Sequence, residues 1–420
     1  MHRVTEHKED VSVVLRGSVA KFFVGAVIHW DRSVREAMDS INTPGFGVYI
    51  HIPFCRTKCN YCTFVIKPWR KDLAERYSRA VIQELDLFLS ENEVSGVADT
   101  IYFGGGTPSL VPAEHIAALL STCRRHFDVP QNCEISLEAN PGTVTAEKAA
   151  AYRGCGITRI SLGAQTFDER SLQAIGRDHT AGQVATSLAL LREKGFENIN
   201  VDLILGLPEQ DEIQWAGNLE MVTQLEPPHI SVYMLELEPK SPLYHLVARG
   251  VHRVPDEDAV SDWYLGALDH LPGHGYAQYE ISNFALPGYE CRHNLKYWQR
   301  RPVFGFGIGS HSFDGRARYA NLAGMNAYLS RVEAGISPVE WRRVLDEKEE
   351  LEETLFLGLR LRSGLNWEEL SEGFGAEQVA EYEKTLRSMS NDGLVEWRDS
   401  SIRLTPRGML LSNEVFQAFV

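Results

Sequence analysis

Three cysteines crowd into a short segment, Cys55-Arg-Thr-Lys-Cys59-Asn-Tyr-Cys62. Their spacing places three thiols on one loop, directly after an apolar run of strand length. Soft thiolate ligands select zinc or iron–sulfur clusters, and such a loop can fold around one face of a cuboidal cluster. Zinc needs a fourth ligand, and His51 lies inside the preceding run rather than on the loop. The spacing therefore favours an iron–sulfur cluster and leaves a zinc site as the alternative.

The remaining cysteines do not form a disulfide framework, because they are scattered along the chain: Cys123, Cys133, Cys155 and Cys291. The most apolar stretch, residues 11–30, is interrupted by Arg16 and Lys21, so it falls short of the roughly 20 clean residues of a membrane span. It also lacks the basic head, short apolar run and small-residue cleavage site that, in this order, mark an export signal. The expected location is therefore cytoplasmic, where thiols stay reduced. No transmembrane segment is expected, and peripheral contact with a membrane remains open.

A glycine run and several polar residues follow later runs of strand length. Phe103-Gly-Gly-Gly-Thr107-Pro108 does not have the G-x-G-x-x-G spacing of dinucleotide sites, and a plain strand-to-helix turn is its alternative interpretation. A carboxylate can accept two ribose hydroxyls, and a guanidinium can clamp a carboxylate, although each such residue alone is an ordinary turn or cap residue. The polar residues of interest are Glu138, Gln165, Arg177 and Asp202.

A second chemical motif lies far downstream, in Cys291-Arg-His293-Asn294-Leu-Lys-Tyr297-Trp298. Its imidazole can ligate iron, and the flat faces of its two aromatic side chains can cover a porphyrin. The ordinary alternative is a buried, hydrogen-bonded His–Asn pair that fastens this loop to the rest of the fold.

Strand-length apolar runs alternate with segments of helical period from residue 47 onward. The runs span 47–54, 100–103, 134–137, 159–162, 200–205 and 229–234, and the helical segments span 71–90, 113–127, 146–153, 181–194 and 212–225. This alternation is typical of βα units on a parallel sheet. Six units predict an α/β fold, a partial (β/α)6 TIM-like barrel. Ligands of such folds gather beyond the carboxyl ends of the strands, so the residues just after each strand are the ones to inspect.

The chain divides into a barrel domain (45–335), a C-terminal domain (340–420) and an N-terminal extension (1–44). Helices at 345–361 and 376–390, a hairpin at 393–397 and 401–404, and a last helix predict a small winged-helix-like α+β domain. Residues 341–420 carry 10 Lys and Arg against 16 Asp and Glu, and the whole chain has a net charge of −15, so no nucleic-acid partner is expected. The extension has no motif, and Met38 leaves an over-called start codon as an alternative to a genuine extension.

The segment Tyr49-Ile-His-Ile-Pro-Phe-Cys55-x3-Cys59-x-Tyr61-Cys62 resembles the radical S-adenosylmethionine (SAM) superfamily. It is most similar to the branch that contains oxygen-independent coproporphyrinogen III oxidases and the HemW haem chaperone family, and the resemblance extends from about Gly47 to the C-terminus. It implies a 4Fe-4S cluster on Cys55, Cys59 and Cys62, with one iron open to the amino and carboxylate groups of SAM. It also implies a set of SAM-binding residues: Tyr49, Tyr61, Gly105, Gly106, Thr107, Glu138, Gln165, Arg177 and Asp202.

Two features separate the members of this branch. The coproporphyrinogen enzymes carry a further cysteine two residues after the third, where this chain has Phe64. The segment 291–298 resembles the full His-Asn-x-x-Tyr-Trp signature of the haem chaperones. The resemblance therefore implies a chaperone that delivers haem to apo-haemoproteins.

The same resemblance suggests which residues hold haem: His293 is the leading ligand candidate and Cys291 the second, beside Tyr297 and Trp298. A radical SAM oxidoreductase of the coproporphyrinogen type is the alternative function, and a structural zinc protein is a third. The motifs leave open whether SAM is cleaved or only held.

Overall fold

The computed structural model describes residues 45–92, 94 and 96–419. These residues form two compact units, which meet in the sequence between Val344 and Leu345. The N-terminal extension, and with it the question of the start codon at Met38, lies outside the described residues. The predicted division into a barrel domain at 45–335 and a C-terminal domain at 340–420 stays a prediction.

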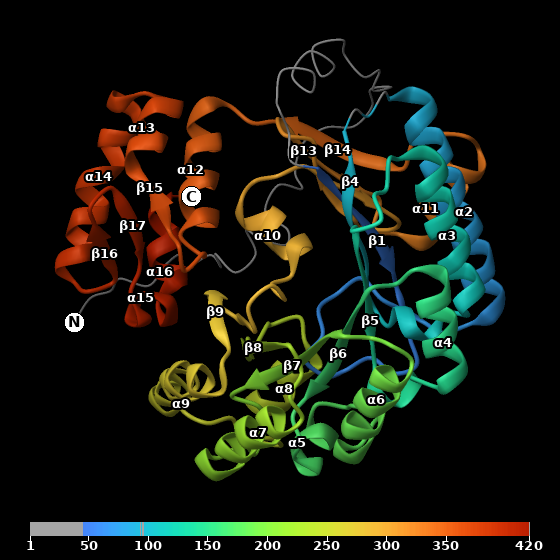
Figure 1. Cartoon of the computed structure of the whole chain (residues 1–420), viewed down its shortest axis with the longest axis horizontal. Helices are drawn as coiled ribbons and strands as arrows, with labels where there is room; N and C mark the ends of the chain where they lie inside the picture. Colours follow the sequence, from blue (N-terminus) through green and yellow to red (C-terminus); the bar gives the residue numbers. More distant parts are fainter. Residues whose placement is uncertain (1–44, 93, 95, 420) are drawn as a thin grey trace. The chain divides into compact units, whose positions relative to one another are not determined.

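One large mixed sheet forms the centre of the unit that ends at Val344 (Figure 1). Its strands follow the order β14-β13-β12-β11-β1-β4-β5-β6-β7-β8-β10-β9. The strands are β1 (Phe46–Ile52), β4 (Ala98–Gly105), β5 (Glu134–Ala139), β6 (Arg159–Gln165), β7 (Asn198–Leu205), β8 (His229–Met234), β9 (Ala277–Glu280), β10 (Asn283–Ala285), β11 (Val303–Phe306), β12 (His311–Phe313), β13 (Ala317–Asn321) and β14 (Val339–Val344).

The six predicted strands are confirmed, and they pair in parallel in chain order from β1 to β8. Strand β11 adds a further parallel strand beside β1, which the sequence did not predict. Because β14 and β9 end the described sheet without pairing to each other, the barrel is open, in agreement with the predicted partial TIM-like architecture.

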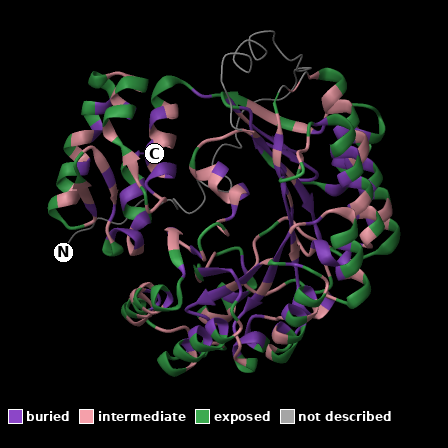
Figure 2. Cartoon of the chain, in the orientation of Figure 1, coloured by how far each residue is buried: buried purple, intermediate pink, exposed green. Residues whose placement is uncertain are grey.

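The five predicted helices are confirmed and lie on the outer face of the sheet, with exposed residues turned outward (Figures 1 and 2). They are α2 (Lys71–Glu91), α3 (Ala113–His126), α4 (Ala146–Cys155), α6 (Ala181–Glu193) and α7 (Glu212–Gln224). Capping boxes begin two of them, at Thr180 with Gln183 and at Asp211 with Gln214. Further helices were not predicted: α5 (Glu169–Ala174), α8 (Pro242–Ala248), α9 (Glu257–His270), α10 (Arg292–Trp298) and α11 (Met325–Glu333).

Residues alternate between the two faces of each strand, and this alternation makes the barrel interior polar. On β5, Ile135 and Leu137 are buried toward one face, whereas Glu134, Ser136 and Glu138 share the other. The inner face of this sheet is therefore lined by groups that can bind polar ligands.

The first predicted run, 47–54, is divided at Pro53, because proline has no N–H to donate to a sheet. Strand β1 ends at Ile52, and Phe54 and Cys55 form a short strand, β2, beside β3 (Lys67–Pro68). This break directs the chain out of the barrel and into the cysteine loop.

The unit from Leu345 onward combines helices with a small antiparallel sheet in the order β15-β17-β16, in agreement with the predicted winged-helix-like module. Its elements are α12 (Glu347–Gly358), β15 (Leu365–Asn366), α13 (Trp367–Phe374), α14 (Ala376–Asn391), β16 (Val395–Arg398), β17 (Ser401–Leu404), α15 (Pro406–Leu410) and α16 (Ser412–Phe416). Helix α13 was not predicted.

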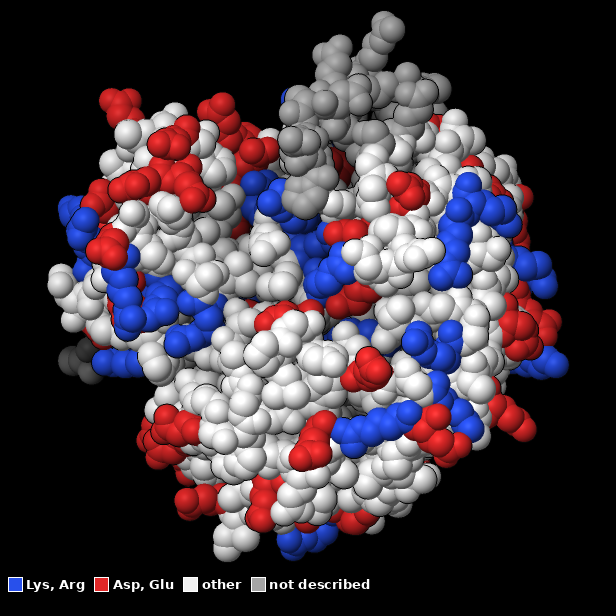
Figure 3. All heavy atoms as spheres, viewed as in Figure 1, with Lys and Arg blue, Asp and Glu red and all other residues white. Residues whose placement is uncertain are grey.

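Within the part of the chain that the structure describes, no helix has both the length and the apolar character needed to cross a membrane. On the face shown in Figure 3, acidic and basic side chains are interspersed.

Candidate functional site

The cysteine loop is held to the carboxyl ends of the strands by backbone hydrogen bonds. Cys55 lies in β2, and its carbonyl accepts from the Trp69 N–H at 2.9 Å. The Cys62 N–H donates to the Cys59 carbonyl at 3.1 Å and closes a turn between these two cysteines. Between them, the Asn60 N–H and side-chain amide donate to the carbonyls that end α5, each at 2.9 Å. The loop is thus fixed at both its strand end and its centre.

Tyr61 anchors the same loop by packing on a buried apolar cluster. The cluster consists of Ile175, Ile204, Leu207 and Leu243, which come from the ends of α5, β7 and α8 and from the loop after β7. Tyr61 therefore lies at the predicted SAM end of the barrel, where it positions the two neighbouring cysteines.

Two side chains donate to the cysteine sulfurs. The Thr107 hydroxyl donates to Cys55 Sγ, and Arg177 Nη1 donates to Cys59 Sγ, both at 3.6 Å. Burial raises the pKa of the Cys55 thiol to about 11, and the bond from Thr107 opposes that rise. Donors of this kind stabilise thiolates, which are the form that ligates iron.

Among the described residues, no three His, Cys, Asp or Glu side chains are placed to surround a single metal ion. A 4Fe-4S cluster has a different requirement, because each cysteine binds a different iron. The three thiols on one loop, with donors aimed at two of them, fit such a cluster. His51 is committed elsewhere, since its ring nitrogens contact the Tyr49 hydroxyl at 3.1 Å and the Val65 carbonyl at 2.9 Å.

The glycine run after β4 is required by close backbone approach. Gly105 has φ +117°, and a Cβ there would lie 2.5 Å from the ring of His51. A Cβ at Gly106 would lie 2.8 Å from the backbone of Pro53 and Phe54. These glycines are therefore required because the end of β4 packs closely against His51 and against the backbone that leads into the cysteine loop.

Glu138 lies on the inner face of β5 and contacts this glycine run. Its Oε2 accepts from the Gly105 N–H at 2.9 Å, and its Oε1 accepts from the Tyr102 hydroxyl at 3.0 Å. Burial raises the pKa of Glu138 to about 7, which these two hydrogen bonds oppose and the nearby Asp202 increases. The carboxyl group thus changes its charge near neutral pH.

Gln165 ends β6, and the side chain of Arg177, a residue that follows α5, reaches the same strand end. Gln165 has φ +68°, an unusual backbone conformation for a residue with a side chain, at a point where the pairing of β6 with β7 is irregular. Such strain occurs often at ligand sites, because it redirects a side chain. Arg177 donates to the Gly163 carbonyl at 2.6 Å as well as to Cys59, so it spans from the strand end to the cysteine loop.

Asp202 and Tyr49 complete the predicted SAM residues on the inner face. Asp202 accepts hydrogen bonds from Ser161 at 3.1 Å and Asn200 at 2.7 Å, and burial raises its pKa. Tyr49 stacks on Tyr102, with ring centroids 6.2 Å apart. The structure therefore brings the predicted SAM residues to one end of the barrel, next to the three cysteines.

We expect SAM affinity to depend on the charge of Glu138. Since ribose hydroxyls donate to an ionised carboxylate, SAM should bind more tightly as the pH rises from about 6 to about 8, through the raised pKa of Glu138. Titration of SAM into the reconstituted protein at several pH values measures this. Glu138→Gln should bind SAM more weakly and with a flatter pH profile, and an unchanged profile in that variant would contradict the prediction.

The segment predicted to hold haem forms α10, which contacts β1 and β4. His293 is only 1% exposed. Its Nδ1 contacts the Thr100 hydroxyl at 2.9 Å, its Nε2 contacts the Tyr297 hydroxyl at 3.1 Å, and its ring stacks on Tyr102 at 5.1 Å. Cys291 is fully buried, and burial raises its pKa to about 12. Haem ligation by His293 thus requires one of two hydrogen bonds to open.

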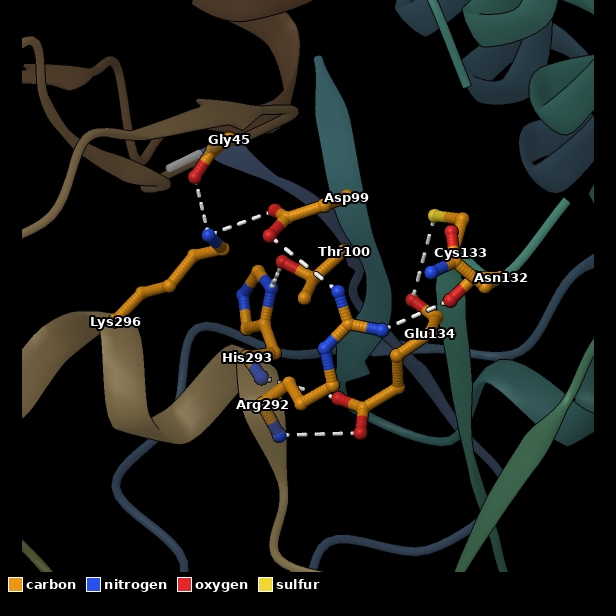
Figure 4. A network of polar contacts seen from close by, with 9 residues as sticks. All are labelled: Gly45, Asp99, Thr100, Asn132, Cys133, Glu134, Arg292, His293 and Lys296. Carbon is orange, nitrogen blue, oxygen red and sulfur yellow. Dashed lines mark hydrogen bonds and ion pairs between the residues drawn. The ribbon is translucent and has the colours of Figure 1, made fainter. Parts of the chain in front are cut away.

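A network of ion pairs and hydrogen bonds, which we call the α10 clasp, fastens this helix to the strands (Figure 4). Glu134 accepts from the backbone N–H groups of Arg292 at 3.1 Å and His293 at 3.0 Å. Asp99 pairs with Lys296 at 2.7 Å and with Arg292 at 3.4 Å. Lys296 also donates to the Gly45 carbonyl. The clasp holds the start of α10 over the amino ends of β4 and β5.

Sequence reasoning missed Tyr102, which links the two predicted sites. Its hydroxyl bonds to Glu138, and its ring stacks on both Tyr49 and His293. The alternation of residues along β4 could have identified Tyr102 as a residue of the inner face, because it falls on the same face as Thr100 and Gly104.

Two family models match this chain. One describes the radical SAM superfamily and matches residues 49–222, and the other describes the HemN C-terminal domain and matches residues 345–411. The family models thus match both units of the structure.

Several curated proteins are similar to this chain over most of its length. It is 35% identical to the heme chaperone HemW of Bacillus subtilis (strain 168) over 377 residues, which cover 89% of this chain and 99% of that protein. It is 36% identical to the heme chaperone HemW of Escherichia coli (strain K12) over 272 residues, which cover 64% of this chain and 71% of that protein.

Among solved structures, coproporphyrinogen III oxidase (HemN) from Escherichia coli, described as a radical SAM enzyme, superposes with a TM-score of 0.80. The superposition covers 93% of each chain at 23% identity. This similarity confirms the predicted fold.

Proposed function

Because this chain belongs to the family of proteins named heme chaperone HemW, within the radical SAM superfamily, we propose that it binds haem and delivers it to apo-haemoproteins in the cytoplasm. Cys55, Cys59 and Cys62 hold a 4Fe-4S cluster in this proposal. The observation that carries it is the joint placement of two motifs in one barrel, the cysteine loop at the carboxyl ends of the strands and α10 beside β1 and β4.

The proposed roles of the SAM-binding residues follow from their contacts. The cluster, when bound, supplies an electron for reductive cleavage of SAM. Arg177 clamps the methionine carboxylate, Glu138 accepts the ribose hydroxyls, and the bare backbone at Gly105 and Gly106 lets the methionine end approach. Thr107 and Arg177 also hold the cysteine sulfurs in place. The other SAM contacts in this proposal are Tyr49, Tyr61, Gln165 and Asp202.

The proposed haem ligand is His293, with Cys291 as the second candidate and Tyr297 and Trp298 as aromatic cover. The Nε2 atom of His293 becomes free when the Tyr297 hydroxyl turns away, and both residues lie on α10, so this change is local. Opening of the Thr100 bond would instead separate α10 from β4. Ligation through Nε2 is therefore the smaller rearrangement.

Anaerobic reconstitution followed by haem titration tests the proposal, with 5′-deoxyadenosine assayed in the same tube. We expect iron and sulfide in the ratio of one 4Fe-4S cluster per chain and saturable haem binding. We also expect loss of the bound-haem spectrum when an apo-haemoprotein is added. A reconstituted protein that binds no haem would contradict the proposal, and zinc without labile sulfide would support the structural zinc alternative.

The alternative function, oxidation of coproporphyrinogen, is disfavoured by Phe64. This side chain is 49% exposed, next to the third cysteine, where the coproporphyrinogen enzymes carry a further cysteine. We expect that Phe64→Cys will not by itself confer decarboxylation, because the substrate must also be held by its four propionates. Product analysis by mass spectrometry is the measurement, and vinyl-bearing product from the single variant would contradict this expectation.

A further inference from the structure

A buried arginine on the inner face of the barrel has an unpartnered donor. Arg159 begins β6 and is 1% exposed, yet its Nε atom has no hydrogen-bond partner among the described residues. Burying a charge without a partner is strongly unfavourable, so native structures supply such a group with an anion or a set of acceptors.

A second unpartnered donor lies beside it. Ser136 on β5 is the register partner of Arg159, so the two side chains project from neighbouring strands on the same face of the sheet. Ser136 is fully buried, and its hydroxyl has no hydrogen-bond partner. A guanidinium and a hydroxyl thus offer adjacent donors to the same space.

Several polar groups on the neighbouring strands are satisfied. Asn200 donates to Ser161 and to Asp202, each at 2.7 Å. His229 contacts Asn200 at 2.6 Å and the Tyr279 hydroxyl at 2.8 Å. One neighbouring acceptor is not satisfied, because Asn198 Oδ1, on the register partner of Arg159 in β7, has no hydrogen-bond partner among the described residues.

Three carboxylates lie near enough to interact with the charge of Arg159, namely Glu134, Glu138 and Asp202, and each already accepts hydrogen bonds from other groups. Glu134 accepts from the backbone of Arg292 and His293 and from the Cys291 thiol, so it serves the α10 clasp (Figure 4). Burial opposes the charge on Arg159, but the neighbouring Cys291 and Glu134 groups hold its pKa above the ordinary value. Arg159 therefore lies near the start of α10, the helix that carries the proposed haem ligand.

We propose that Arg159 and Ser136 form a carboxylate site that binds one propionate of haem, an inference that rests on the proposed haem-binding function. A guanidinium binds a carboxylate bidentately, and the serine hydroxyl supplies a third donor. In this proposal the propionate accepts from both donors while His293 reaches the iron through Nε2.

The test compares haem with its dimethyl ester, which has the same ring and iron but no carboxylates. Wild-type protein should bind haem about tenfold or more tightly than the ester, because one charged hydrogen-bonded contact is lost. Arg159→Gln and Ser136→Ala should bind both forms with more nearly equal affinity, and Arg159→Lys should retain part of the preference. Ser187→Ala is the matched control, because Ser187 is also buried but lies on α6 and bonds to the Pro141 carbonyl.

Equal affinity of the wild type for haem and its ester, or an unchanged preference in Ser136→Ala and Arg159→Lys, would overturn the proposal. These two variants carry the test even where Arg159→Gln fails to fold. A wild type that binds neither form contradicts the proposed function instead. The site is then judged with sodium propionate, which should raise the melting temperature of the wild type above that in sodium chloride at equal ionic strength. The same rise in Arg159→Gln, or no rise in the wild type, would overturn the carboxylate site itself.

Discussion

Replacing Cys55, Cys59 or Cys62 with alanine is expected to abolish the iron–sulfur cluster. Three thiolates leave no spare ligand, so each single variant should lose all cluster iron and sulfide after anaerobic reconstitution. The measurements are iron and sulfide content and the visible absorption of the cluster. A full cluster in Cys59→Ala would contradict the assignment of this loop.

The matched controls are the cysteines outside the loop. Cys123 and Cys133 are buried, burial raises the pKa of each thiol to about 12, and Cys155 donates to the Tyr152 carbonyl. Their alanine variants should keep the full cluster. Any loss of stability from the small cavities should appear in thermal unfolding and not in the iron content.

His293→Ala is expected to weaken haem binding and to shift the visible absorption of bound haem, because the axial ligand sets the electronic state of the iron. The cluster and SAM cleavage should persist in this variant. Trp298→Ala should weaken haem binding by about 1–3 kcal/mol, since only an apolar contact is lost. Haem titration and absorption spectra measure both effects.

The α10 clasp supplies the control for a purely structural role of His293. Asp99→Asn removes the negative charge that pairs with Lys296 and Arg292, yet it keeps the imidazole. If His293 ligates haem, Asp99→Asn should keep the wild-type haem spectrum. If His293 only fastens α10, then Asp99→Asn and His293→Ala should lower the melting temperature alike and lose cluster together. An unchanged spectrum in a stable His293→Ala protein would transfer the ligand role to Cys291.

The sequence predicted those strands and helices whose apolar residues recur at a regular spacing within one short segment. The strands β1 and β4 to β8 and the helices between them follow from apolar runs and helical period. The position of β11 could not be predicted, because Val303–Phe306 pairs with β1 across a sequence separation of more than two hundred residues. The position of helix α10 could not be predicted either, because its first backbone N–H groups donate to Glu134, which lies on the distant strand β5.

The candidate site also has one part that the sequence could predict and another that it could not. The spacing of Cys55, Cys59 and Cys62 is contained in one loop, and the sequence was therefore sufficient to propose a cluster there. The importance of Tyr102 and Arg159 depends on which strands are neighbours. A strand pattern assigns each to a face, but it does not reveal that Tyr102 meets His293 or that Arg159 Nε lacks a hydrogen-bond partner.

Within the described residues the open barrel has two sheet edges, and exposed edges can pair with strands of other molecules and so promote aggregation. At one edge, β14 carries Glu340, Arg342 and Arg343, and the first and last of these are exposed. At the other edge, β9 is only four residues long. The charged side chains on β14 and the short length of β9 both disfavour pairing with a strand of another molecule. An open barrel with such edges is therefore protected against fibrillar assembly.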